Sequence, residues 1–217
     1  MTDLYSQLHQ FFNTRKRFYF PFESDMEYIP LNGIYILFEK GEKYQQWDRI
    51  VRVGTHIGSN QLRSRLLQHF VIENKNRSIF RKNIGRAILN KNGNPYLRIW
   101  ELDTTSRAEK SKNGHLIDKP LEKDLEGQIS KYIQDNLSFT VFKMTDKEKR
   151  LFWESKIISS LARSPDIYIS ESWLGSYSPK DKIREFGLWQ VNQLFKKPLD
   201  ISEFLILSGQ IGNNTST

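Results

Sequence analysis

Two short apolar runs joined by a polar loop constrain the fold of this chain more than any other feature of its sequence. The first run, residues 33–38 (GIYILF), is β-branched and aromatic and stops at two charged residues, which is typical of a buried strand. The second run, residues 49–54 (RIVRVG), alternates polar and apolar residues until a glycine ends it. The two runs predict an antiparallel β-hairpin across the loop of residues 41–48.

A basic amphipathic segment follows the predicted hairpin. Three apolar residues recur every four positions and form one stripe of a helix: Leu62, Leu66 and Phe70. Ser59 or Asn60 is the candidate N-cap of this helix. Arg65 and His69 share a neighbouring stripe, one turn apart, so the pattern places an arginine and a histidine together beside the end of the hairpin.

The hairpin and this helix resemble the GIY-YIG nuclease superfamily, which includes homing, repair and restriction endonucleases. Gly33-Ile34-Tyr35 is identical to the family's first motif. The second motif is Tyr-Ile-Gly in most members and corresponds here to Arg52-Val53-Gly54, so an arginine stands where the family has a tyrosine. Leu62, Arg65 and His69 match the family's helix signature. The resemblance covers residues 31–161, with a non-matching insertion inside this range.

A glutamate in a later helix completes the resemblance. The pattern Thr145-x-x-Glu148 predicts the N-terminal cap of this helix, and Glu154 lies in the middle of its apolar face. Burying an unpaired carboxylate is costly, so Glu154 needs a cation nearby or a place at the floor of a cleft. A buried ion pair with Arg65 is the structural alternative to a metal ligand. The family's glutamate has the same place after a third strand, which favours the metal ligand, and Asn192 is the candidate for an asparagine that often follows it.

The resemblance implies metal-dependent hydrolysis of phosphodiester bonds in double-stranded DNA. Glu154 is then the ligand of one Mg²⁺ or Mn²⁺ ion, because both ions suit carboxylate and water ligands. Arg65 has the permanent charge and the fork geometry to clamp the phosphate in the transition state. Tyr35 is the candidate base for the attacking water, and His69 accepts or relays the same proton.

Both proton-handling residues also have a structural interpretation, in which Tyr35 is an ordinary strand aromatic and His69 a helix residue hydrogen-bonded to the sheet. A Tyr35→Phe substitution removes only a hydroxyl group. The sequence therefore predicts that it lowers the rate and leaves stability almost unchanged.

Arg52 separates the possible functions. Because arginine cannot act as a base, either Arg52 is an additional phosphate contact, with His56 or Tyr44 in the polar role of the missing tyrosine, or catalysis is lost. The first case is an endonuclease of the restriction or repair type. The second is a catalytically weak or inactive, GIY-YIG-like nucleic-acid-binding protein. A third possibility is an unrelated α+β module that binds acidic proteins, but pure binding does not require a carboxylate such as Glu154 in an apolar helix face.

The net charge of +8 favours a polyanionic partner. Positive residues crowd the segment after the first helix of the motif without a balancing acid after Glu73, which favours a phosphate-contacting surface over a solvated face. The candidate DNA contacts are Arg63, Lys75, Arg77, Arg81, Lys82 and Arg86. A second candidate surface is the cluster of residues 15–17 (RKR) with the aromatic residues that follow it, whose structural alternative is the solvated end of a packed helix.

The remaining segments predict an α+β fold with a small three-stranded antiparallel sheet, formed by residues 33–38, 49–54 and 138–144, flanked by helices. Residues 1–30 form an N-terminal helix, capped by Thr2, and a basic, aromatic arm. Residues 31–165 form the core, with an insertion at 96–135 that contains a strand at 96–102, an exposed excursion at 103–120 and a helix at 121–133. A helical C-terminal extension, 166–208, packs on the core, and 209–217 is a disordered tail.

Composition excludes several kinds of site. The chain has no cysteine, which rules out a disulfide framework and a thiolate zinc site, and its four histidines lack a His-x-x-x-His spacing. Any metal ion is therefore held mainly by oxygen ligands. No apolar run approaches the roughly 20 residues of a membrane-spanning helix, and no signal-peptide pattern is present. We therefore expect a cytoplasmic protein.

Overall fold

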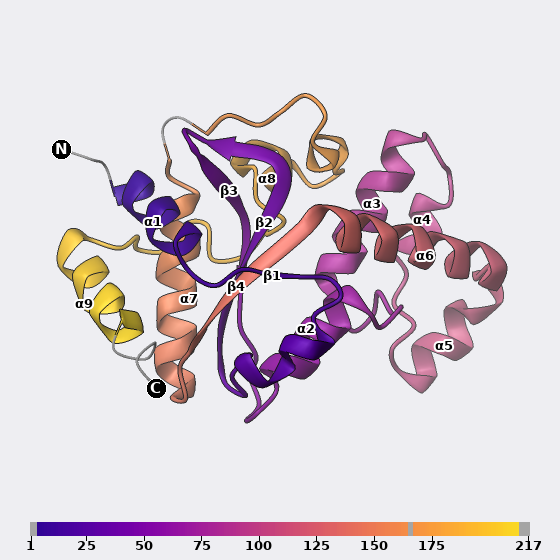
Figure 1. Cartoon of the computed structure of the whole chain (residues 1–217). Coiled ribbons are helices and arrows are strands. Elements are labelled where there is room, and N and C mark those ends of the chain that lie inside the picture. Colours follow the sequence, from indigo (N-terminus) through magenta and orange to yellow (C-terminus); the bar gives the residue numbers. More distant parts are fainter. Residues whose placement is uncertain (1–3, 165–166, 213–217) are drawn as a thin grey trace.

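The structure, a computed structural model, describes residues 4–164 and 167–212 and has the α+β architecture that the sequence predicts (Figure 1). One antiparallel sheet has the strand order β1-β4-β2-β3. The strands are β1 (Phe18–Tyr19), β2 (Gly33–Tyr44), β3 (Trp47–Gly54) and β4 (Leu137–Lys143). The three predicted strands are present, and the short β1 adds a fourth on the free edge of β4.

The hairpin of β2 and β3 is longer than the sequence predicts. Strand pairing continues to Tyr44 and Trp47, so the predicted loop of residues 41–48 is wrong. The chain reverses instead at Gln45, whose φ of 53° lies in the left-handed region. The pairing register shifts between Leu37 and Phe38 and again before Lys43, so this part of the hairpin is irregular.

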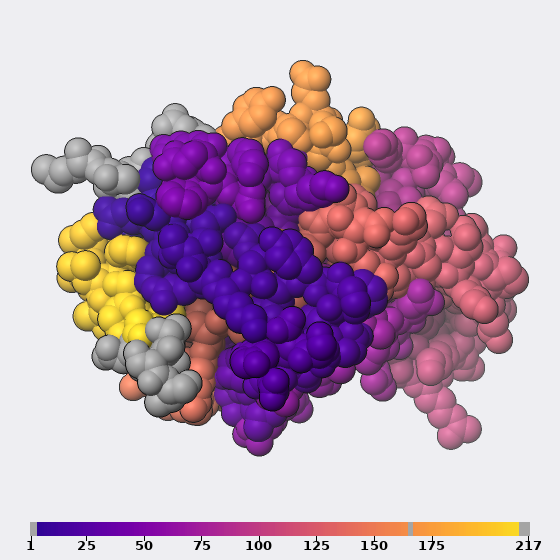
Figure 2. Space-filling view, viewed as in Figure 1, coloured from indigo at the N-terminus to yellow at the C-terminus, as the bar shows by residue number. Residues whose placement is uncertain are grey.

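Helices cover both faces of the sheet (Figure 1). On one side lie α1 (Leu4–Asn13), α7 (Lys147–Leu161) and α9 (Ile201–Gly212). On the other side lie α2 (Leu62–Phe70), α3 (Ile79–Lys91), α4 (Leu97–Trp100), α5 (Arg107–Asn113) and α6 (Lys119–Asn136). Short helical turns and α8 connect them: η1 (Glu23–Tyr28), η2 (Gly114–Leu116), η3 (Leu174–Tyr177) and α8 (Asp181–Phe186). Figure 2 shows the N-terminal segment in indigo across the middle of one face, beside α9 in yellow.

The two faces of β2 contribute to two separate cores. Ile34, Ile36 and Phe38 pack in the core on the side of α1 and α7. Tyr35 and Leu37 pack in the core on the side of α2 and α3. Successive strand residues point to opposite faces, and both faces are covered, so this segment reads as an unbroken apolar run. Tyr35 therefore points toward the helix that carries the motif's arginine and histidine.

Several local predictions differ from the structure. Residues 96–102 contain helix α4 rather than a strand, and the excursion at 103–120 contains α5. The cap of α7 is Asp146, whose side chain accepts a hydrogen bond from the backbone N–H of Lys149, so the predicted Thr145 cap is wrong. Helix α2 begins after Gln61 without a side-chain cap, so neither Ser59 nor Asn60 has that role. The predicted cap Thr2 lies outside the described residues.

The C-terminal part of the chain is fastened to the hairpin by a buried carboxylate. Glu39 of β2 accepts hydrogen bonds from the indole N–H groups of Trp173 (2.8 Å) and Trp189 (2.9 Å), and from the hydroxyl of Tyr132 in α6. Burial raises the pKa of Glu39. The predicted disordered tail is helical as far as Gly212, and residues 213–217 lie outside the described part. Among the described residues, no helix has the length and apolar character to span a membrane.

Candidate functional site

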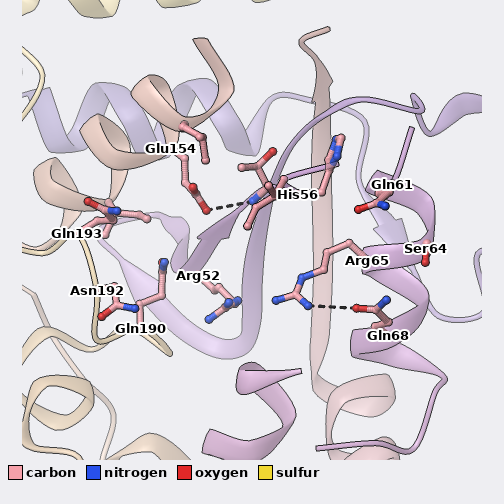
Figure 3. Close-up of a pocket in the computed structure, with 14 residues that line it drawn as sticks. Arg52, His56, Gln61, Ser64, Arg65, Gln68, Glu154, Gln190, Asn192 and Gln193 are labelled. Carbon is pink, nitrogen blue, oxygen red and sulfur yellow. Dashed lines mark hydrogen bonds between the residues drawn. The ribbon is translucent and has the colours of Figure 1, made fainter. Parts of the chain in front are cut away.

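A cavity of about 580 Å³ lies beside the end of β3, between α2, α7 and the C-terminal segment of residues 190–193 (Figure 3). It is lined by Arg52, Thr55, His56, Ile57, Gln61, Ser64, Arg65, Gln68, Leu151, Glu154, Ile158, Gln190, Asn192 and Gln193. In Figure 3, Glu154, Gln190 and Asn192 lie on one side, Arg65 lies on the other, and Arg52 lies between them. Three of the predicted catalytic residues, Arg52, Arg65 and Glu154, therefore share one cavity.

Among the described residues that line this cavity, Glu154 has the single carboxylate. Its Oε1 accepts a hydrogen bond from the backbone N–H of Thr55, at 3.1 Å, which fixes one oxygen against the end of β3. Burial raises the pKa of Glu154, while Arg52, the Thr55 hydrogen bond and Arg65 act in the opposite direction. Within residues 4–164 and 167–212, no ion pair within 4.0 Å includes Glu154. The proposed buried salt bridge with Arg65 is therefore wrong, and Glu154 lies at the wall of a cleft.

Arg65 reaches the opposite wall from α2. Its Nη1 donates to the side-chain oxygen of Gln68, at 3.1 Å, and to the backbone carbonyl of Arg77, at 2.9 Å. These two contacts use one nitrogen of the guanidinium group, which has five N–H donors in a planar fork. The remaining donors can face the cavity, into which the guanidinium group points in Figure 3.

Arg52 is buried and donates hydrogen bonds through two of its nitrogens. Its Nη1 donates to the backbone carbonyl of Trp189, at 2.5 Å, and its Nε donates to the hydroxyl of Tyr35, at 3.3 Å. Arg52 pairs with Leu37 across the hairpin, and Gly54 pairs with Tyr35, so the arginine and the tyrosine are diagonal neighbours on the same face of the sheet. The arginine in the second motif is thus a direct partner of the tyrosine in the first.

Tyr35 and His69 form a buried hydrogen-bonded pair behind Arg52. The Tyr35 hydroxyl lies 2.8 Å from His69 Nε2, and His69 Nδ1 lies 2.8 Å from the hydroxyl of Ser78. Both Tyr35 and His69 are 0% exposed, and neither lines the cavity. Burial lowers the pKa of His69 well below its ordinary value, with further contributions from Arg65, Arg52 and Arg81, all of which favour the neutral ring. The structure brings the predicted proton-handling residues together but covers them.

Gly54 is required by this pair rather than by its backbone conformation. A Cβ atom added at Gly54 would lie 2.2 Å from the Tyr35 hydroxyl. Of the two residues proposed to replace the missing tyrosine, His56 lines the cavity, with Nε2 accepting from the backbone N–H of Gly33 at 3.3 Å. Tyr44 stacks on His9, at a ring distance of 4.3 Å near the far end of the hairpin, and does not line the cavity.

The basic segment after α2 is mostly buried and paired, which contradicts its predicted role. Three of its cations form ion pairs within the protein: Lys75 with Glu122 (2.5 Å), Arg81 with Glu126 (2.7 Å) and Arg86 with Glu101 (2.5 Å). All three are buried. A buried cation that is bonded to a carboxylate cannot also reach a phosphate, so their prediction as DNA contacts is wrong.

The other predicted cations differ in exposure. Lys82 donates to the backbone carbonyl of Glu101 at 2.9 Å, and Arg63 donates to that of Ile29 at 2.7 Å. Arg77 is exposed beside Arg65. In the second candidate cluster, Lys16 pairs with Asp25 at 2.9 Å and Arg17 with Asp48 at 3.6 Å.

The sequence did not indicate most of the cavity's amide side chains. Asn192, the weak candidate taken from the resemblance, does line the cavity, as do Gln61, Gln68, Gln190 and Gln193. Gln190 and its neighbours are far from the motif in sequence and have no pattern that predicts their place. Only the geometry of the C-terminal segment assigns them to the site.

The donor set of the cavity fits a hard divalent cation bound by few protein atoms. In the described part of the chain, no group of three or more His, Cys, Asp or Glu side chains could hold a metal ion. Mg²⁺, however, often keeps several waters and binds through one or two carboxylates together with substrate phosphates. Glu154 offers one oxygen beyond the one bonded to Thr55, which is the type of ligand that such a site uses.

A family model described as GIY-YIG domain matches residues 1–216 of the chain. The chain belongs to the GIY-YIG domain family. The match extends beyond the motif-bearing hairpin and includes the C-terminal segment that closes the cavity. GIY-YIG proteins are in general nucleases that act on DNA and use divalent metal ions. Comparisons with curated proteins and with solved structures find no match.

Proposed function

We propose that this GIY-YIG protein is a metal-dependent endonuclease that hydrolyses phosphodiester bonds in double-stranded DNA. The observation that carries the proposal is the convergence of one carboxylate and two guanidinium groups on one cavity, from Glu154 in α7, Arg65 in α2 and Arg52 in β3. Phosphodiester hydrolysis needs positive charge beside the phosphate oxygens and a place for the attacking water. The cavity offers both.

The charged residues have separate roles in this reaction. The attacking water forms a bond to phosphorus while the bond from phosphorus to the leaving oxygen breaks. The Arg65 donors that face the cavity stabilise the charge that develops on the non-bridging oxygens. Glu154 would hold Mg²⁺ or Mn²⁺, which supplies further positive charge at the phosphate and the leaving oxygen.

The proton of the attacking water leaves through the buried pair. Tyr35 accepts it while its own proton passes to His69 Nε2, 2.8 Å away. The lowered pKa of His69 opposes this transfer, because burial and the neighbouring arginines disfavour the charged ring. Arg52 lines the cavity and donates to the Tyr35 hydroxyl, so it lies between the cavity and this pair.

The same burial supports a second candidate function. Because Tyr35 is 0% exposed and an arginine has replaced the second motif tyrosine, the protein could bind DNA with little or no cleavage. Nicking of supercoiled plasmid with Mg²⁺ or Mn²⁺, compared with chelator and with the Glu154→Gln variant, separates the two functions. Metal-dependent nicking that the variant lacks supports the endonuclease. DNA binding without nicking under all metal conditions supports the second function.

The positions at which the protein cuts DNA distinguish a restriction-type from a repair-type endonuclease. A restriction-type enzyme cleaves a random-sequence DNA pool at a defined set of sites. A repair-type enzyme cleaves lesion-containing duplexes in preference to intact ones. Mapping the cleavage positions on both substrates separates these two proposals.

A further inference from the structure

The C-terminal segment runs along the outer edge of β3 and contacts three consecutive residues of that strand. The backbone N–H of Trp189 donates to the carbonyl of Val51, at 2.7 Å. The carbonyl of Trp189 accepts from Arg52 Nη1, at 2.5 Å. The backbone N–H of Val53 donates to the side-chain Oε1 of Gln190, at 2.9 Å. This edge of the sheet is therefore satisfied by a segment that also enters the cavity.

These contacts fix the direction of the Gln190 amide group. A backbone N–H can only donate, so the oxygen of Gln190 faces Val53 and its NH₂ group lies on the other side of the amide. Gln190 is 8% exposed and lines the cavity, on the same side as Glu154, with Arg52 between it and Arg65 (Figure 3). Within residues 4–164 and 167–212, no protein acceptor is bonded to this NH₂ group.

We propose that Gln190 contacts the substrate, with Nε2 donating a hydrogen bond to a non-bridging oxygen of the phosphodiester in this cavity. The inference rests on the proposed endonuclease function. An NH₂ group can only donate, and the cavity also presents the donors of Arg52 and Arg65, so its complement is an anionic oxygen. Gln190 adds a neutral donor on the wall opposite Arg65. The phosphate oxygens can then accept hydrogen bonds from both sides of the cavity.

Two substitutions distinguish a substrate contact from a structural support for β3. The two roles predict opposite answers to which of the two variants is less active. Gln190→Glu keeps an oxygen that accepts from Val53 and replaces the NH₂ group with a negatively charged oxygen. Gln190→Ala removes both groups. If Gln190 has only a structural role, Gln190→Glu should be nearly as active as the parent protein and Gln190→Ala should be less active. If Gln190 donates to the phosphate, Gln190→Glu should be less active than Gln190→Ala, because the negative charge of glutamate repels the substrate.

The experiment measures kcat/KM for nicking of supercoiled plasmid, and affinity for a DNA duplex by fluorescence anisotropy with Ca²⁺. We expect Gln190→Ala to lower kcat/KM by about tenfold to a hundredfold, as the loss of one donor to a charged oxygen does. We expect Gln190→Glu to lower it by about a further tenfold. Melting temperatures check that both variants fold, and the alanine variant should be the less stable one because it leaves the Val53 N–H without its acceptor.

Gln193→Glu is the control for added negative charge. Gln193 lines the same cavity but is exposed at its rim, and its oxygen is also held, by the Ser155 hydroxyl at 3.2 Å. A direct contact predicts a larger loss for Gln190→Glu than for Gln193→Glu. Equal losses, or a glutamate variant at position 190 that is as active as the alanine variant or more so, overturn the assignment of Gln190 alone. A parent protein that neither binds nor cleaves DNA overturns the proposed function, and this inference with it.

Discussion

Replacing Tyr35 with phenylalanine tests the buried pair at the centre of the site. The substitution keeps the ring in the strand and removes the hydroxyl, which lies 2.8 Å from His69 Nε2 and 3.3 Å from Arg52 Nε. His69 is 0% exposed, so its ring nitrogen would lose its partner in a place that water does not reach. A buried polar group left unpaired costs about 1–3 kcal/mol. The structure thus predicts a measurable loss of stability, where the sequence predicts almost none.

The assay is thermal unfolding of the parent and the variant in the same buffer. For a chain of 217 residues, each kcal/mol shifts the melting temperature by about 2–4 °C, so we expect a decrease of about 2–12 °C. Tyr19→Phe is the matched control, because Tyr19 is 63% exposed and loses the same hydroxyl group in solvent. We expect the control to change the free energy of unfolding by less than about 0.5 kcal/mol.

The rate of nicking should also fall, by about a hundredfold to ten-thousandfold, if Tyr35 takes the proton of the attacking water. Equal melting temperatures for the Tyr35 and Tyr19 variants would refute the buried hydrogen bond. Normal cleavage by a destabilised Tyr35→Phe variant would leave the hydrogen bond standing and remove Tyr35 from the chemistry.

Four further outcomes follow from the site. Glu154→Gln should abolish Mg²⁺-dependent cleavage and leave DNA binding intact or stronger, and full activity of this variant would exclude Glu154 as the metal ligand. Because the pKa of His69 is lowered in the folded protein, the unfolded chain binds a proton more readily below pH ~6.5. Stability should therefore fall as the pH drops below that value. His69→Gln should reduce this pH dependence in melting curves measured from pH 5 to 8. Arg52→Tyr restores the usual motif residue but loses the contact with Trp189, so it should lower the cleavage rate, and a higher rate would indicate that Arg52 marks decay. Arg86→Ala should reduce the melting temperature without changing the slope of log affinity against log salt, and a slope smaller by about one would restore Arg86 as a phosphate contact.

The motif half of the site could be predicted from sequence because its residues are local. Tyr35, Arg65 and His69 lie within one hairpin and the following helix. Helical periodicity places Arg65 and His69 on one stripe, and the resemblance to the family motif adds Tyr35. The other wall could not be predicted. Gln190 reaches the cavity through a hydrogen bond to Val53, 137 residues away in sequence, and no local pattern encodes such a contact.

The prediction for the basic segment was wrong for the same reason. Lys75, Arg81 and Arg86 have no balancing acid nearby in sequence, yet their partners lie 47, 45 and 15 residues further along the chain. The alternation in residues 96–102 failed for a related reason. Trp100 packs against Gly85, where a Cβ atom would lie 2.5 Å from the indole, so tertiary packing rather than strand propensity determines that segment.

The contact between Trp189 and the edge of β3 determines when during synthesis the site becomes complete. A ribosome makes the chain from the N-terminus at about 5–20 residues per second. By the time Glu154 has been added, Tyr35, Arg65 and His69 are already present, but the carbonyl that holds Arg52 and the amide of Gln190 are not. A nascent chain that stops short of Trp189 therefore carries every motif residue and lacks the contact that places Arg52, so its cavity is incomplete.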